Sequence, residues 1–250
     1  PRMILCIDSG NSRIKWGLHD DGRWLEAGVI AHADADQLAS LAHRLPPATR
    51  IMLANVAGDA ALASVRQALV ERRSAVHEVK SASEAGGVVN LYEVPGQLGV
   101  DRWCALLGAR SLTSAPCVVV MAGTATTIDS LDGGGRFLGG FILPGFDLMR
   151  RSLARDTAAL PLAEGKYCAW PRCTDDAITS GCVEAQVGAI ERAVARLGNG
   201  ATCLLSGGAA VVIGEHLGIP HRRVDNLVLE GLRRLAGDLP AYHASGKISS

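Results

Sequence analysis

Short apolar runs separated by small polar turns alternate with longer periodic segments along this chain. The short runs, bounded by Gly, Asp or Ser, predict buried β-strands. They are residues 3–8, 13–18, 24–30, 50–55, 76–79, 117–120, 128–131, 136–143 and 202–205. The longer segments carry apolar residues at helical spacing. They predict helices at residues 36–44, 59–73, 98–112, 148–153, 175–197 and 227–237. The mixture predicts an α/β protein.

The same order of elements begins the chain and returns near its middle. A strand at 3–8, a turn at Gly10 and two further strands open the sequence. After the break at 113–116, a strand, a turn at Gly123 and two more strands follow. A dinucleotide-binding opening would place a helix directly after the first turn, so this pattern argues against that fold. The repetition predicts an internal duplication, with an N-terminal half at 1–115 and a C-terminal half at 116–250.

Composition narrows the possible partners and location. The chain has 25 Lys and Arg against 25 Asp and Glu, so it lacks the net positive charge that drives nonspecific nucleic-acid binding. No apolar run is long enough for a membrane span. The 7 Cys are scattered with no C-x-x-C pair, which favours a reduced, cytoplasmic protein. We expect the tail 244–250 to be disordered.

Three glycine turns are the first sign of chemistry. Gly10, Gly123 and Gly207 each follow an apolar strand. Without side chains in the way, backbone N–H groups of such turns can converge on an anion. One such turn is equally typical of a structural hairpin, but three favour binding of nucleotide phosphates. The sequence has neither a P-loop nor an intact G-x-G-x-x-G after a strand.

Charged residues flank the first turn. Asp8 precedes it, and Lys15 follows on the strand face that also carries Arg13. A carboxylate beside a phosphate is unfavourable unless a cation lies between them, and Mg²⁺ held through water would meet that need. The alternatives are that Asp8 caps the turn and that Lys15 is a solvated strand residue.

Six short motifs occur along the chain at 7–15, Tyr92 with 98–103, 123–127, 139–145, 157–161 and 175–181. Together they resemble the motifs of the type III pantothenate kinases, in the same order. The resemblance extends to the subgroup described as Bvg accessory factors, which are linked to expression of virulence genes. It covers nearly the whole sequence, and short motifs seldom recur together at such separations.

The resemblance implies a duplicated ribonuclease H-like fold of the kind found in actin, Hsp70 and the acetate and sugar kinases. It implies phosphorylation of pantothenate by ATP to 4'-phosphopantothenate, the first step toward coenzyme A. The expected cofactors are ATP, Mg²⁺ and a monovalent cation, K⁺ or NH₄⁺. The expected partners are pantothenate and a second copy of the chain, with the substrate pocket near the interface of the homodimer.

Family motifs also imply residue roles. Asp101 would be the catalytic base that accepts the proton of the pantothenate hydroxyl, and its alternative role is a helix N-cap. Arg102 would contact the pantothenate carboxylate or the transferring phosphate, and its alternative is a structural salt bridge. The residues expected to bind pantothenate are Tyr92, Gly99, Val100, Asp101, Arg102 and Thr174, the last from the other subunit.

The nucleotide site is expected at the glycine turns. The turn at 206–208 would lie near adenine or ribose, or is an ordinary strand–helix turn. Met121 stands where the family usually has an Asp that helps hold the monovalent cation, and a thioether is a poor ligand for a hard ion. The cation requirement is therefore in question. The ATP-binding residues are expected to be Asp8, which would also orient Mg²⁺, Ser9, Gly10, Asn11, Ser12, Arg13, Ile14, Lys15 and Thr124.

Two other classes of protein share parts of this pattern. A regulatory protein of the Bvg accessory factor type could keep the fold with weak or no kinase activity, and the loss of the acid at Met121 favours it. An actin-like ATPase or phosphatase would share the glycine turns but would lack the pocket at 99–102. Retention of Asp8 and Asp101 favours the kinase.

Overall fold

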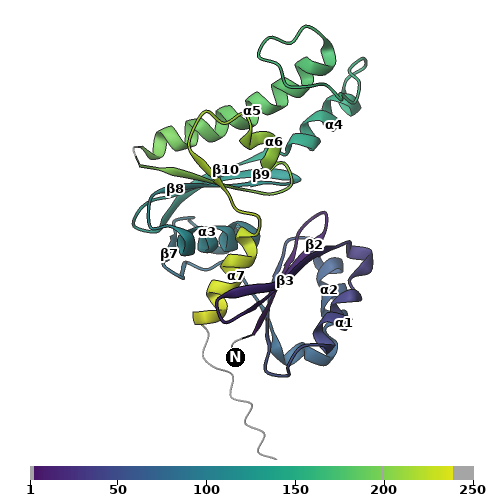
Figure 1. Cartoon of the computed structure of the whole chain (residues 1–250), viewed down its shortest axis with the longest axis vertical. Coiled ribbons are helices and arrows are strands. Elements are labelled where there is room, and N and C mark those ends of the chain that lie inside the picture. The colour runs from purple at the N-terminus through teal and green to yellow at the C-terminus, as the bar shows by residue number, and fades with distance from the viewer. Residues whose placement is uncertain (1–2, 199, 239–250) are drawn as a thin grey trace, which may run out of the picture. The chain divides into compact units, whose positions relative to one another are not determined.

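The computed structural model describes residues 3–198 and 200–238, which divide into two compact units (Figure 1). The first unit contains the described residues up to Lys80 and those from Leu232 onward, and the second is Ser81–Gly231. The predicted tail 244–250 lies outside the described residues. Within the described parts of the chain, no helix combines the length and apolar character needed to cross a bilayer.

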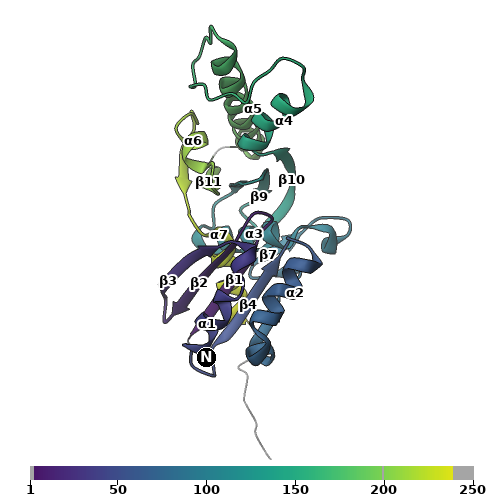
Figure 2. The ribbon, with the colours of Figure 1, turned by 90° about the vertical axis from the view of Figure 1, so that its right-hand side faces the viewer.

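The first unit is built on a five-stranded sheet in the order β3-β2-β1-β4-β5, and Figure 2 shows β3, β2, β1 and β4 next to one another. The first three strands pair antiparallel, β4 runs parallel to β1, and β5 runs parallel to β4. Helices α1 (Gln37–His43) and α2 (Asp59–Ala68) share a buried apolar core with this sheet. The strands are β1 (Ile4–Ser9), β2 (Ile14–Asp20), β3 (Arg23–Ile30), β4 (Arg50–Asn55) and β5 (Val76–Glu78).

The second unit contains a seven-stranded sheet in the order β12-β11-β8-β9-β10-β7-β6. Strands β8, β9 and β10 pair antiparallel, β11 runs parallel to β8, and β12 runs parallel to β11. The strands are β6 (Glu84–Ala85), β7 (Val88–Asn90), β8 (Cys117–Ala122), β9 (Ala125–Leu131), β10 (Arg136–Pro144), β11 (Thr202–Ser206) and β12 (His221–Arg223).

The two sheets repeat one topology, which confirms the predicted duplication. In each sheet three consecutive strands pair antiparallel, β1–β2–β3 in the first and β8–β9–β10 in the second. The next strand in the repeat, β4 or β11, pairs parallel with the free side of β1 or β8. One more parallel strand, β5 or β12, lies beyond it. The second sheet adds β7 and β6 at one edge. The compact units differ from the predicted halves, because residues 81–115 lie in the second unit, where β7 pairs with β10. A division of the duplicated halves at residue 115 stays a prediction.

Helices of the second unit cover both faces of its sheet. Figure 1 shows α4 (Phe146–Asp156), α5 (Thr174–Leu197) and α6 (Ala210–Gly214) on one face and α3 (Val100–Leu112) on the other. Side chains of β8 alternate accordingly, and Val118 and Val120 join the core beneath α5.

The helix α3 packs closely against the start of α7 (Leu227–Asp238). A side chain at Gly108 would stand 2.2 Å from the Leu227 carbonyl oxygen, and one at Gly231 would stand 1.9 Å from the Cys104 carbonyl oxygen. Glycine at both positions lets the two helix backbones approach each other directly. Residues 227–231 of α7 belong to the second unit, and the helix continues into the first.

Most predicted elements are present, and the differences have local causes. The helix predicted at 59–73 ends at Ala68, and a 3₁₀ helix (Val70–Ala75) follows after the buried Leu69. The turn predicted at 123–127 contains only Gly123 and Thr124, since the β-branched residues after it pair in β9. The helix predicted at 148–153 extends over the whole of α4.

Candidate active site

The first glycine turn connects β1 to β2 and is held by backbone and side-chain bonds. The N–H of Gly10 donates to the Arg13 carbonyl oxygen over 3.2 Å. The Nε2 atom of His32 lies 2.7 Å from the Gly10 carbonyl oxygen, and as a donor it holds the turn from outside. His32 was not predicted, because its 3₁₀ helix (His32–Asp34) lies beyond β3 in the sequence.

Asp8 and Lys15 occupy opposite positions of the β1–β2 ladder, so their side chains share one face. The next pair, Ser9 and Ile14, is fully buried and lies on the face of Ile7, toward the α1–α2 core. Of the residues predicted to bind ATP, Ser9 and Ile14 could therefore contribute only backbone groups at this face. The other predicted residues of the turn, Asn11, Ser12 and Arg13, are exposed.

Asp8 is the predicted Mg²⁺ ligand at this turn. Asp8 is 9% exposed at the end of β1. Mg²⁺ usually keeps several waters and is bound by one or two carboxylates together with substrate phosphates, so the donor set fits that ion. Among the described residues, no group of three or more His, Cys, Asp or Glu side chains is placed to hold a metal without such help.

The second glycine turn, at Gly123 and Thr124, lies between two close backbone contacts. The N–H of Gly145 donates to the Thr124 carbonyl oxygen over 2.9 Å, and a Cβ at Gly145 would stand 2.1 Å from the Gly123 carbonyl oxygen. A Cβ at Gly207 would stand 2.3 Å from the Ala122 carbonyl oxygen. The turn at 206–208 thus packs directly against the start of the second turn. Its contact with adenine or ribose stays a prediction.

The position of the family's cation-binding acid offers no charged oxygen. Met121 lies in register with Thr127 of β9 and Ser206 of β11. The hydroxyl oxygens of Thr127 and Ser206 are buried without a hydrogen-bond partner among the described residues. Two neutral hydroxyls beside a thioether do not replace a carboxylate, so the monovalent cation does not fit this position as the family would hold it.

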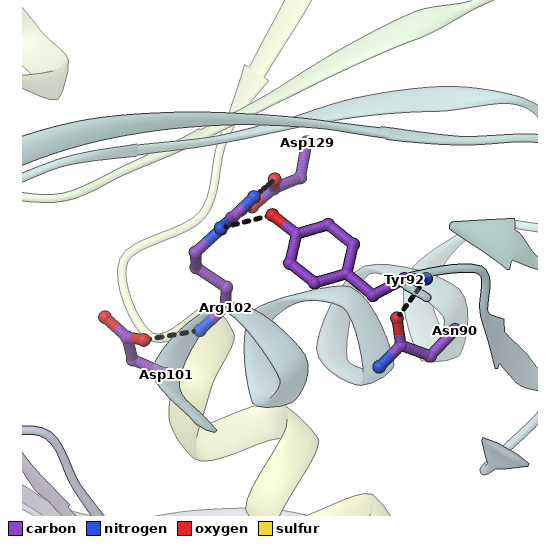
Figure 3. Close-up of polar contacts among 5 residues, drawn as sticks. All are labelled: Asn90, Tyr92, Asp101, Arg102 and Asp129. Atoms are coloured by element: carbon purple, nitrogen blue, oxygen red, sulfur yellow. Dashed lines mark hydrogen bonds and ion pairs between the residues drawn. The ribbon is translucent and has the colours of Figure 1, made fainter. Parts of the chain in front are cut away.

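The first turn of α3 carries the predicted substrate motif (Figure 3). Gly99 is the N-cap, and Asp101 lies within the helix, where its Oδ1 accepts a hydrogen bond from the Arg102 N–H over 2.8 Å. The alternative that Asp101 is the N-cap is therefore wrong, because the helix begins one residue earlier, at Val100. A Cβ at Gly99 would stand 2.7 Å from Asp101 Oδ1, so glycine leaves room for the carboxylate.

Arg102 forms the salt bridge that was its alternative role, with an acid that sequence reasoning missed. Its Nε and Nη2 atoms donate to Asp129 Oδ2 and Oδ1 over 3.1 and 2.5 Å. Its Nη1 donates to the Tyr92 hydroxyl over 3.0 Å, so both predicted substrate residues meet here. The sequence could have indicated Asp129 through its position in the strand. Side chains alternate between the two faces of a strand, and Asp129 lies on the face of β9 that α3 covers.

Burial and charge act in opposite directions on this pair. Burial alone would lower the pKa of the Arg102 guanidinium, but the hydrogen bonds and charge of Asp129 outweigh it and hold that pKa above its usual value. Burial raises the pKa of the Asp129 carboxyl, and the hydrogen bonds from Arg102 oppose that rise.

Thr174 lies apart from the other predicted pantothenate residues. It begins α5 and lines a cavity of about 530 Å³ between α4 and α5, together with apolar residues such as Leu153 and Ile178. This cavity is on the face of the sheet opposite α3. The structure therefore brings Tyr92 close to the start of α3 within one chain, and it does not bring Thr174 there.

Solved structures share this architecture. A candidate Baf family transcriptional activator from Campylobacter jejuni superposes with a TM-score of 0.65, at 20% identity, over 94% of this chain and 98% of that one. A candidate 2-dehydro-3-deoxygalactonokinase from Sinorhizobium meliloti superposes with a TM-score of 0.57, at 15% identity, over 94% and 98% of the two chains. The repeated sheets and these neighbours define the duplicated ribonuclease H-like fold of the sugar kinase and actin class.

Sequence comparison identifies the family within that class. The family model for type III pantothenate kinase matches residues 4–196. The type III pantothenate kinase of Dechloromonas aromatica is 57% identical over 235 residues, which cover 94% of this chain and 99% of the relative. That of Aromatoleum aromaticum is 52% identical over 236 residues, covering 94% and 98%. The chain belongs to the type III pantothenate kinase family and is a kinase.

Proposed function

We propose that the protein transfers the terminal phosphate of ATP to the primary hydroxyl of pantothenate. The products are ADP and 4'-phosphopantothenate. The observation that carries this proposal is the substrate motif at the start of α3, where the Asp101 carboxylate accepts from the Arg102 backbone N–H and the Arg102 guanidinium donates to the Tyr92 hydroxyl. The glycine turns that follow β1 and β8 support it, because each leaves backbone N–H groups open to an anion.

The proposed reaction requires little covalent help from the protein. Asp101 accepts the proton of the pantothenate hydroxyl while the hydroxyl oxygen forms a bond to the terminal phosphorus of ATP. The bond between that phosphorus and the oxygen that bridges it to ADP breaks. Backbone N–H groups of each glycine turn can bind phosphate oxygens, and Lys15 offers a cation beside Asp8. Mg²⁺, held by Asp8 through water, would offset phosphate charge when bound.

Release of ADP with and without pantothenate tests the proposed function. We expect release that depends on pantothenate. Release that is equal without pantothenate would indicate an actin-like ATPase, and no release under either condition would indicate the regulatory alternative. The proposal includes a cytoplasmic location, since ATP is the donor and all seven cysteines are free.

We further propose that turnover does not require K⁺ or NH₄⁺, because Met121 replaces the acid. Exchanging K⁺ for a bulky organic cation at constant ionic strength should change kcat by less than about twofold, as expected without a bound ion. Met121→Asp should introduce K⁺ dependence of the midpoint for thermal unfolding with ATP present. Met121→Leu, the matched control, should not. Strong activation of the unaltered protein by K⁺ would contradict this.

A homodimer with shared sites is the arrangement we propose for Thr174. Since Thr174 and the start of α3 lie on opposite faces of one sheet, a second copy would have to bring them together. Mixing a protein carrying Asp101→Asn with one carrying Thr174→Leu tests this. In mixed dimers one of the two sites would keep both residues, so random exchange should restore about a quarter of full activity. Activity no higher than the mean of the two parents would contradict shared sites.

A further inference from the structure

The Arg102–Asp129 pair is more deeply buried than the other ion pairs described in this structure. The Arg102 side chain is 5% exposed and that of Asp129 is fully buried. Two parallel N–H···O bonds join them, so the carboxylate fixes both the plane and the tilt of the guanidinium (Figure 3). Burying such a pair seldom stabilises a fold more than apolar side chains of similar volume would. Stability alone therefore gives a weak reason for an ion pair at this place.

Aromatic and polar groups hold the guanidinium from its other side. The Tyr92 hydroxyl accepts a hydrogen bond from Nη1, and the Tyr92 and Phe137 ring centroids lie 5.7 and 5.8 Å from Arg102 Cζ. Tyr92 is itself held, because its backbone N–H donates to Asn90 Oδ1 over 3.1 Å. One N–H of Nη1 and one of Nη2 have no partner within the described residues. Those two donors are the ones available to a ligand.

Gly140 provides the space that this pair occupies. It lies opposite Asp129 in the β9–β10 ladder. A Cβ at this position would stand 1.9 Å from Asp129 Oδ1 and 2.9 Å from Arg102 Nη2. Any larger residue would displace the carboxylate or the guanidinium, and its Cβ would also stand 2.6 Å from the Ile128 carbonyl oxygen. The absence of a side chain at Gly140 is thus a second, independent feature that maintains the geometry of the pair.

We infer that Asp129 is a positioning residue that aims the two remaining N–H donors of Arg102 at the carboxylate of pantothenate, and that Gly140 keeps the space for this arrangement. The inference rests on the proposed function. It favours the carboxylate over the transferring phosphate as the group that Arg102 binds. Asp129 already balances the charge of Arg102. Arg102 therefore offers a ligand two oriented hydrogen-bond donors, and it does not act as an unpaired cation. A static carboxylate suits such donors, whereas a phosphoryl group gaining charge calls for an unpaired cation.

Asp129→Asn tests the inference through the separation of KM from kcat. The amide of asparagine has nearly the volume of the Asp129 carboxylate, but it has only one oxygen that can accept a hydrogen bond. The Arg102 guanidinium therefore loses one of its two parallel bonds, and its plane is no longer fixed. We expect KM for pantothenate to rise by about 10- to 100-fold. We expect kcat and KM for ATP to stay within about threefold, because the phosphate-binding groups are untouched. Asp132→Asn, which removes a partner of the exposed Arg136, is the matched control and should change neither constant.

A double-mutant cycle shows whether Asp129 acts through Arg102. In an Arg102→Gln background, Asp129→Asn should raise KM for pantothenate by less than about twofold further, because no guanidinium remains to be positioned. An additive effect would overturn the inference. So would an unchanged KM in the single Asp129→Asn variant, or a fall in kcat with KM unchanged.

Gly140→Ala provides a second variant that keeps both charges. Like Asp129→Asn, it should raise KM for pantothenate, because it displaces the pair. If Asp129→Asn does not fold, Gly140→Ala alone tests the positioning role. If neither variant folds, the pair is structural and the inference is overturned. Failure of the proposed function looks different, since the unaltered protein itself would then show no ADP release that depends on pantothenate.

Discussion

Asp101→Asn is expected to lower kcat by about 10²- to 10⁴-fold, the range that loss of a positioned general base usually produces. The amide has nearly the same shape as the carboxylate and can still accept the bond from the Arg102 N–H at the start of α3. It cannot accept a proton from the substrate alcohol. KM for ATP should therefore change little, since the glycine turns are unaltered. Steady-state kinetics with both substrates varied give the required separation.

An acid in the first turn of a helix also stabilises that helix, so this prediction needs a matched control. Asp147 occupies the first turn of α4 as Asp101 occupies that of α3, and its exposed carboxylate lies 3.5 Å from Arg150 Nη1. Asp147→Asn should cost a similar amount of stability, about 1 kcal/mol or less, and leave kcat unchanged. Near-normal turnover of the Asp101→Asn variant would remove Asp101 from the proposed mechanism.

Gly207→Ala is expected to destabilise the protein by about 3 kcal/mol or more, because it combines two unfavourable changes. Gly207 has a φ of +104°, where a side chain is strained. Its Cβ would also stand 2.3 Å from the Ala122 carbonyl oxygen, and backbone cannot move aside as a flexible side chain can. The displaced strand end leads into the Gly123 turn, so KM for ATP should rise about tenfold or more in whatever folded protein remains.

The neighbouring glycine supplies the control for that substitution. A Cβ at Gly208 meets nothing within 4 Å, and its φ is outside the left-handed region. Gly208→Ala should therefore unfold in urea at nearly the same midpoint as the unaltered protein. If Gly207→Ala unfolded at that midpoint too, the close contact between the third turn and Ala122 would be disproved.

The sequence predicted the repeated strand–turn–strand order because local signals carry it. A buried apolar run followed by a glycine turn is visible within about ten residues, as at Asp8 and Gly10. Strands β6 and β7 were missed because they have only two and three residues, and because β10, which pairs with β7, lies far along the chain. No local pattern could indicate that pairing, and it is this pairing that draws the segment into the second unit.

The candidate site was predictable to a different degree at each residue. Asp101 and Arg102 are adjacent in a recognisable motif, so the sequence located both. Asp129 is 27 residues from its partner Arg102, and only the sheet brings them together. Strand alternation could have placed Asp129 on the α3 face, but its pairing required the third dimension. The sequence shows a glycine at position 140, but the need for glycine there follows only from the atoms that a Cβ would meet in the structure.

Phosphorus NMR of the product formed from ATP and pantothenate is the decisive test of the proposed reaction. We expect a phosphate monoester on the primary alcohol of pantothenate, formed in equal amount to ADP and strongly reduced in the Asp101→Asn variant. Inorganic phosphate as the only other product of ATP, with pantothenate recovered unchanged, would contradict it.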